Sequence, residues 1–158
     1  MARPEVKAVR NLLGTAVSYA YAVKAGPWIF LNGHEAFDFE SGIPEEVAGW
    51  AGFPLFGRPR SRREGDFFLH RMRRILREFG SDLPQGVRLD QYYPHPRAVA
   101  AYHLARHAEF GDYIPPSTSV VVERCFAAVA AQQPIGLALF VSKTLPLRAS
   151  RLLDKTAR

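Results

Sequence analysis

The stretch VRLDQYYPHPRAVAAYHLARHAEFG, residues 87–111, contains a strand pattern followed at once by a helix pattern. Apolar and polar residues alternate through the first seven positions, which is typical of a half-buried strand. Pro96 then stands where the first turn of a helix accepts proline, and Gly111 follows Phe110 as a helix-ending residue. These signals predict a strand over residues 87–93 and a helix that ends at Phe110.

A proline corner follows this helix. DYIPPSTSVVVER, residues 112–124, begins with turn-forming residues and continues as a β-branched run that predicts a strand from Ser117 to Phe126. Because two prolines fix the turn, the backbone N–H groups and hydroxyls of the Ser-Thr-Ser triplet can face a small polar or anionic group. Hydroxyls that satisfy only local backbone groups explain the same residues equally well.

The residues before position 87 predict two strands and a helix. SYAYAVKAG (18–26) and WIFLNG (28–33) have the composition of adjacent strands. Residues 63–79 carry apolar side chains at helical spacing and arginines mostly on the other side, and Gly80 ends this helix. Residues 37–61 show no sustained period and predict a long loop, with room for a short helix at residues 44–50. Its aromatic residues fit a functional lid or a small packed cluster.

The predicted order is therefore two strands, a long loop, then helix, strand, helix and two strands, the last in GLALFV (136–141). This order predicts an α+β fold, in which a mixed sheet packs on two helices. Several strands are apolar on both sides, so a neighbouring subunit in a closed oligomer is expected on the face without helices. We expect one domain over residues 1–158, with a core of about 15–142 and a basic tail from 143.

The composition is that of a folded soluble protein. The 158 residues are 47% hydrophobic and 23% charged, and no apolar run is long enough to cross a membrane. A single cysteine, Cys125, excludes an internal disulfide and favours the cytoplasm. The net charge of +6 suits an acidic partner, but much of it lies in residues 58–77 and the tail. A solvated basic face explains that distribution more simply than nucleic-acid binding.

Familiar nucleotide-binding and hydrolase motifs are absent from the sequence. It contains no GxGxxG after a strand, no P-loop and no GxSxG. His103 and His107 are four residues apart, as zinc ligands on a helix often are, but Leu104 stands where a metalloprotease carries its glutamate. Since no third ligand is evident, we expect neither a metal site nor a cofactor.

The order and spacing of these segments resemble the Rid (reactive intermediate deaminase, YjgF-type) family. The resemblance covers about residues 19–141, and it rests on YAYAVKAGPWIFLNGH (19–34), RRILREFGSDL (73–83), VRLDQYYPHPRAV (87–99), AYHLARHAEFG (101–111) and the proline corner before STSVVVE. It implies a chorismate-mutase-like fold and a homotrimer.

The resemblance also implies a chemistry. Characterised Rid proteins hydrolyse reactive enamines and imines to ketones and ammonia in clefts between subunits. In the family an arginine after the proline corner holds the substrate carboxylate, and a glutamate on the last strand is invoked to handle water. This sequence has Ser117 at the arginine position and Ala138 near the glutamate position. Either the substrate is held differently, or the family reaction is not performed.

Candidate site residues follow from this resemblance and from side-chain chemistry. His34 and His103 are candidate catalytic groups, because a histidine pKa lies near neutrality and the side chain can carry protons. The expected substrate-binding residues are Tyr19, Asn32, Gly33, Ser117, Thr118 and Ser119.

Three functions remain open at this stage. The leading one is a Rid-like enamine or imine deaminase, or a related hydrolase of small reactive metabolites. The second is a Rid-like protein that binds small metabolites without turnover. The third, ranked last, is RNA binding or a ribonuclease-like activity of the basic helix and tail, because aromatic residues are not interleaved with the basic ones as stacking on bases would require.

Overall fold

The computed structural model of the protein describes residues 4–9, 16–38, 41–49, 57–113, 115–123 and, for the backbone, 138–144. The helical segments are α1 (Glu45–Ala48), α2 (Arg60–Glu78), the 3-10 turn η2 (Leu83–Gln85) and α3 (Ala98–Phe110). The strands are β1 (Glu5–Val9), β2 (Tyr19–Ala25), β3 (Trp28–Leu31), β4 (His34–Glu35), β5 (Gly86–Tyr93), β6 (Ser117–Val121) and β7 (Ala138–Thr144).

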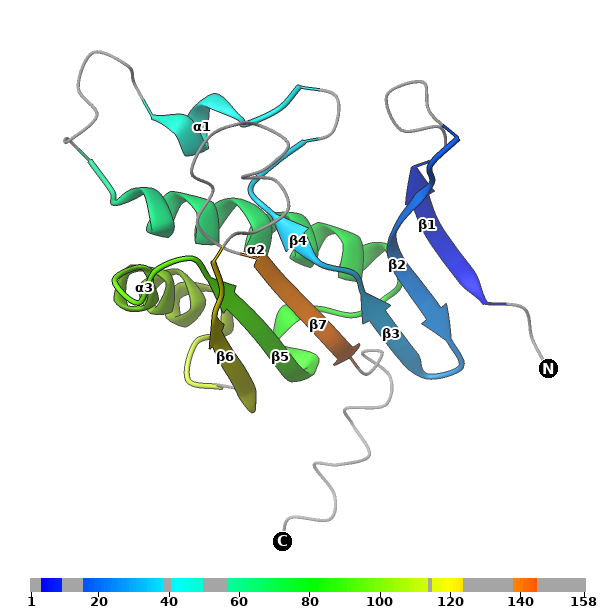
Figure 1. Cartoon of the computed structure of the whole chain (residues 1–158). Helices are drawn as coiled ribbons and strands as arrows, with labels where there is room; N and C mark the ends of the chain where they lie inside the picture. The colour runs from blue at the N-terminus through cyan, green and yellow to red at the C-terminus, as the bar shows by residue number, and fades with distance from the viewer. Residues whose placement is uncertain are drawn as a thin grey trace, which may run out of the picture.

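The strands form one mixed sheet in the order β1-β2-β3-β7-β5-β6, and the short β4 also pairs with β7. β5 and β6 run parallel, because α3 connects them as a crossover, whereas the other described pairs are antiparallel. Both long helices lie on the same side of the sheet (Figure 1). This layering confirms the predicted α+β class.

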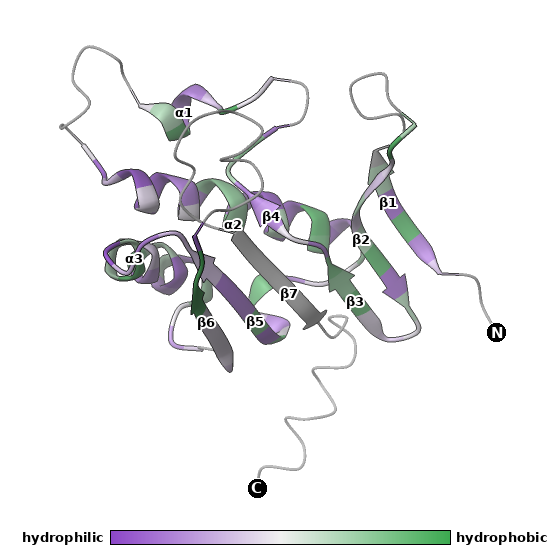
Figure 2. Cartoon of the chain, viewed as in Figure 1, coloured by the Kyte–Doolittle hydropathy of each residue, from purple (hydrophilic) through white to green (hydrophobic). Residues whose placement is uncertain are grey.

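The core lies between the two long helices and the sheet. Helix α2 is apolar along one face and basic along the other, a pattern visible in Figure 2. The helices approach closely at Gly65, where a Cβ atom would stand 2.9 Å from Ala105 Cβ. Buried side chains of α2, α3 and the sheet fill the layer, among them Phe68, Met72, Leu76, Tyr102, Ile29, Leu31, Leu89 and Tyr93.

The sheet face turned away from the helices is also apolar. Ile29 and Leu31 are buried beneath the helices, so Phe30 between them faces the other way and is 38% exposed. Val6 is exposed, and so is Val120, which pairs with Tyr92 across β5 and β6. The apolar residues on both sides of several strands predict this second apolar face.

Several element boundaries differ from the sequence prediction. Strand β1, which precedes the expected core boundary at residue 15, was not predicted, because its EVKAV segment has only five residues. Helix α2 begins three residues earlier than predicted, directly after Pro59, and α3 begins at Ala98, so Pro96 lies in the preceding turn. Cys125, the predicted strand residues 124–126 and 136–137, residues 50–56 of the long loop and residues 145–158 of the tail lie outside the described residues.

Candidate functional site

The proline corner leads into β6, which ends the strand order of the sheet. The Pro116 carbonyl accepts a hydrogen bond from the backbone N–H of Leu89 at 3.0 Å, which starts the parallel β5–β6 ladder. The Pro115 carbonyl instead accepts from the Arg106 guanidinium, with Nη2 at 2.6 Å. The corner is therefore fixed both by the sheet and by a side chain of α3.

The three hydroxyls of the triplet do not face the same way. Ser117 pairs with Leu89 and Ser119 with Gln91, so both lie on the helix side, whereas Thr118 between them faces the open side. The Arg88 guanidinium lies 3.5 Å from Thr118 Oγ1. The expected binding triplet is thus a pair of serines on one face and a threonine on the other.

Buried donors hold the two serine oxygens. Arg106 Nη1 donates to Ser117 Oγ at 2.9 Å, and Gln91 Nε2 donates to Ser119 Oγ at 3.2 Å. The Gln91 amide oxygen in turn accepts from the Tyr93 hydroxyl at 3.3 Å. Both serines are exposed. Ser119 also hydrogen-bonds the Tyr93 side chain. Because Arg106 occupies an acceptor position of Ser117 Oγ, the Ser117 O–H is available to donate outward.

Gln91 and Arg106 are the residues of this network that sequence reasoning missed. Gln91 is fully buried, and only 2% of the surface of Arg106 is exposed. A signal for Gln91 was present, since the alternation of the VRLDQYY strand places this polar side chain on the same face as Leu89 and Tyr93. Buried polar side chains require hydrogen-bond partners, so Gln91 marks a polar network.

A second group of predicted residues gathers where β2 contacts the turn between β3 and β4. The Tyr19 hydroxyl donates to the Gly33 carbonyl, and the Asn32 side-chain oxygen accepts from the Gly33 N–H at 2.8 Å. The Tyr21 ring stacks on His34 with centroids 5.9 Å apart. Tyr21 lies opposite a register shift in the β1–β2 pairing, a bulge that alters side-chain direction. Tyr19, Asn32, Gly33 and His34 therefore come together as expected.

The buried setting keeps this second group neutral. His34 is 2% exposed. Burial lowers the pKa of His34 to about 4, the positive charge of Arg71 lowers it further, and the backbone of Tyr21 opposes the shift. Burial also raises the pKa of Tyr19 to about 12, with smaller contributions from Tyr21 and Glu35. At neutral pH both side chains are uncharged.

His103 belongs to neither group. It lies on the exposed side of α3, where its ring meets Tyr102 edge-on at 5.7 Å. Partial burial lowers its pKa, and the charge of Arg106 lowers it further. No contact described in the structure joins His103 to His34 or to Ser117. The two predicted catalytic histidines are therefore not brought together within one chain.

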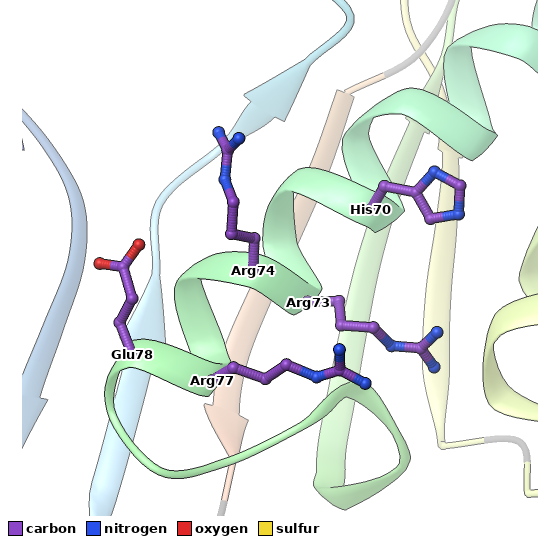
Figure 3. A pocket seen from close by; sticks show the side chains of 5 residues that line it. All are labelled: His70, Arg73, Arg74, Arg77 and Glu78. Carbon is purple, nitrogen blue, oxygen red and sulfur yellow. The ribbon is translucent and has the colours of Figure 1, made fainter.

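The basic face of α2 forms a shallow pocket lined by His70, Arg73, Arg74, Arg77 and Glu78 (Figure 3). Most of its charges are already paired. Asp82 accepts from Arg73 at 2.9 Å and from Arg77 at 3.0 Å, and Glu109 lies 2.8 Å from His70. In Figure 3 Arg74 extends away from Arg73 and Arg77. This face is therefore a network of ion pairs rather than a row of free cations for a phosphate backbone.

The described residues offer neither a metal-binding cluster nor a membrane-spanning helix. Among them no cluster of three or more histidine, cysteine or acidic side chains is arranged to hold a metal ion. No helix in the same residues combines the length and apolar character needed to cross a membrane.

Comparison with known proteins gives structural neighbours only. No family model matches the sequence. No curated protein matches it either. Among solved structures, a Klebsiella pneumoniae protein provisionally described as an endoribonuclease superposes with a TM-score of 0.65 at 21% identity, covering 81% of this chain and 100% of that one.

Two further neighbours have names that connect to the resemblance found in the sequence. RidA from the Antarctic bacterium Psychrobacter superposes with a TM-score of 0.60 at 17% identity, covering 80% of this chain and 87% of its own. A YjgF/YER057c/UK114 family protein from Mycobacterium tuberculosis gives 0.58 at 16% identity, covering 80% and 86%. The chain therefore has the fold of the RidA and YjgF proteins, as its resemblance to the Rid family predicts.

Proposed function

We propose that this protein is a Rid-like hydrolase of small enamines or imines that carry a carboxylate, and that the Ser117–Ser119 corner binds this carboxylate. The observation that carries the proposal is the exposed Ser117 oxygen, which accepts from Arg106 and so leaves its own O–H as a donor. A carboxylate is an acceptor-only group, so such a donor suits it.

The cleft in this proposal is shared between copies of the chain. Within one sheet, β6 and β2 are separated by β5, β7 and β3. At the usual spacing of neighbouring strands, four steps place Ser117 and Tyr19 roughly 19 Å apart, too far for both to contact one small metabolite. A neighbouring subunit that packs at the edge strand β6, where Ser117 and Ser119 are exposed, would supply the second group, and a homotrimer fits both this need and the family resemblance.

In the proposed reaction, water adds to the carbon of the C=N bond and a proton goes to the nitrogen. The C–N bond then breaks, ammonia leaves, and the carbon becomes a ketone. His34 is poorly suited to carry this proton at neutral pH, because its pKa of about 4 makes it a weak base in a buried position. His103 is the histidine of the candidate pair that solvent reaches.

A carboxylate lies beside the position where the family glutamate is missing. Glu35 of β4 is the cross-strand partner of Ala138. We include Glu35 in the proposal as the group that handles water, in place of the family glutamate.

A binding protein without turnover is the second candidate. It is favoured by the neutral, buried state of His34 and by the absence of a described contact between His103 and the corner. Such a protein would bind small carboxylates and leave imines unchanged.

Ammonia release from freshly generated 2-iminoacids tests the two candidates. The hydrolase predicts release faster than in buffer, with a marked loss in Ser117→Ala, Glu35→Gln and His103→Ala. The matched control is Arg74→Gln on the basic face of α2, which lies outside the proposed site and should retain the wild-type rate. Rates equal to buffer for the wild-type protein would refute the hydrolase and leave the binding protein.

A further inference from the structure

Arg106 is a buried cation that hydrogen-bonds only neutral groups in the described part of the chain. Its guanidinium donates to the Pro115 carbonyl at 2.6 Å, to Ser117 Oγ at 2.9 Å and to Gln91 Oε1 at 3.4 Å. Its Nε atom has no hydrogen-bond partner among the described residues. With 2% of its surface exposed, the side chain is shielded from water.

Other charged groups in the same layer are paired with opposite charges. The buried Glu64 meets Arg60 at 3.0 Å, and the buried Glu109 meets both His70 and Arg73. For Arg106, no carboxylate of the described residues comes within ion-pair distance. A buried charge without a counter-charge is strongly unfavourable, so this arrangement needs an explanation beyond packing.

The direction of the hydrogen bond from Arg106 to Ser117 explains why a buried charge is kept at this position. The oxygen of Ser117 accepts from Arg106, so its own hydrogen points elsewhere, and the bond to a cation polarises that O–H group. The same guanidinium reaches the Pro115 carbonyl and Gln91, which holds Ser119. Arg106 thus holds the corner from the side of helix α3, and its positive charge acts on a ligand bound at the exposed serine hydroxyls.

We propose that Arg106 is a positioning residue that makes the Ser117–Ser119 corner selective for a small carboxylate over a neutral ligand of the same shape. The proposal rests on the proposed function for the place of binding but not for turnover. The ligand touches the serine hydroxyls, and Arg106 acts on it through them. The charge that selects the ligand is therefore supplied from helix α3 rather than from the strand that carries the hydroxyls.

The test uses two matched probes, butanoate and its neutral isostere butanamide. Each is titrated into the full-length protein while the backbone amide resonances of residues 117–119 are followed by NMR. The wild type should bind butanoate at least about tenfold more tightly, the effect of one charge-assisted hydrogen bond. Arg106→Gln, which keeps a donor near Ser117 and loses the charge, should remove this preference. Arg74→Gln makes the same charge change on α2 and should retain it.

A second measurement covers the case in which Arg106→Gln does not fold. In the wild-type protein the side-chain Nε–H resonance of Arg106 should shift on addition of butanoate and not of butanamide. Equal affinity of the wild type for the two probes overturns the proposal, as does a preference that survives in Arg106→Gln. If the protein prefers butanoate but releases no ammonia, the proposed role of Arg106 is supported and only the hydrolase hypothesis is refuted. The two failures are therefore distinguishable.

Discussion

Protonation of His34 should control the stability of this fold in mild acid. The side chain is 2% exposed and stacks on Tyr21, and burial lowers its pKa from 6.5 to about 4. In the unfolded chain the imidazole takes up a proton as pH falls through about 6.5, whereas in the folded chain it does so near pH 4. The unfolded state therefore binds more protons in this window, and stability is lost as pH falls from 6.5 towards 4.

The size of this loss follows from the two pKa values. The interval between 6.5 and about 4, at about 1.36 kcal/mol per pH unit, corresponds to roughly 3 kcal/mol over the whole window. At pH 5 the expected loss is already about 2 kcal/mol. This is a large part of the total stability of 5–15 kcal/mol that is typical of a domain.

Urea unfolding at a series of pH values between 4 and 7.5 measures the effect. His34→Phe keeps an aromatic ring beside Tyr21 and cannot be protonated. Between pH 7.5 and 4 the variant should therefore lose roughly 3 kcal/mol less of its free energy of unfolding than the wild type loses. His103→Gln, on the exposed side of α3, should follow the wild-type curve much more closely. Parallel curves for the wild type and His34→Phe would show that His34 is not buried in its neutral form.

Two further substitutions test the packing and the capping of the helices that carry the site. Gly65→Ala should lower the free energy of unfolding by about 1–3 kcal/mol, because the added Cβ would stand 2.9 Å from Ala105 and 3.1 Å from Tyr102. Urea titration measures this loss, and the second substitution Ala105→Gly in the same chain should recover part of it. Asp82→Ala should lower the free energy of unfolding by about 1–2 kcal/mol, since it removes the cap on η2 and the ion-pair partner of Arg73 and Arg77. Asp82→Asn keeps a side-chain oxygen that can cap η2, so the same titration should show a smaller loss.

The sequence predicted most of the fold because its helices and central strands carry strong local signals. The apolar stripe of α2 and the alternation of β5 each identify an element without knowledge of its neighbours. Strand β1 lacks such a signal: EVKAV is short, and pairing with β2 orders it. β4 has only two residues, and it exists because His34 and Glu35 pair with β7, which is about a hundred residues later in the chain. Contacts of this range cannot be seen in local patterns.

The candidate site was predictable to a similar extent. The corner itself could be found, since two prolines before a β-branched run mark a rigid turn. The partner of the corner could not, because Arg106 comes from the helix between β5 and β6 and meets Ser117 only once α3 packs on the sheet. In the sequence this arginine looked like one more polar position on a helix that also carries His103 and His107.

Ser117, which stands where the resemblance to the Rid family implies an arginine, does not leave the corner without a positive charge, because Arg106 lies 2.9 Å from its hydroxyl oxygen. The alternation of side chains along β6 places Ser117 on the helix side of the sheet, where a side chain from α3 can reach it. A long arginine at position 117 and a buried arginine at position 106 would bring two like charges to the same corner, which is unfavourable in a shielded environment. The serine and the buried Arg106 are therefore understood best as one arrangement, in which the charge lies behind the Ser117 hydroxyl and the proposed ligand would meet neutral donors.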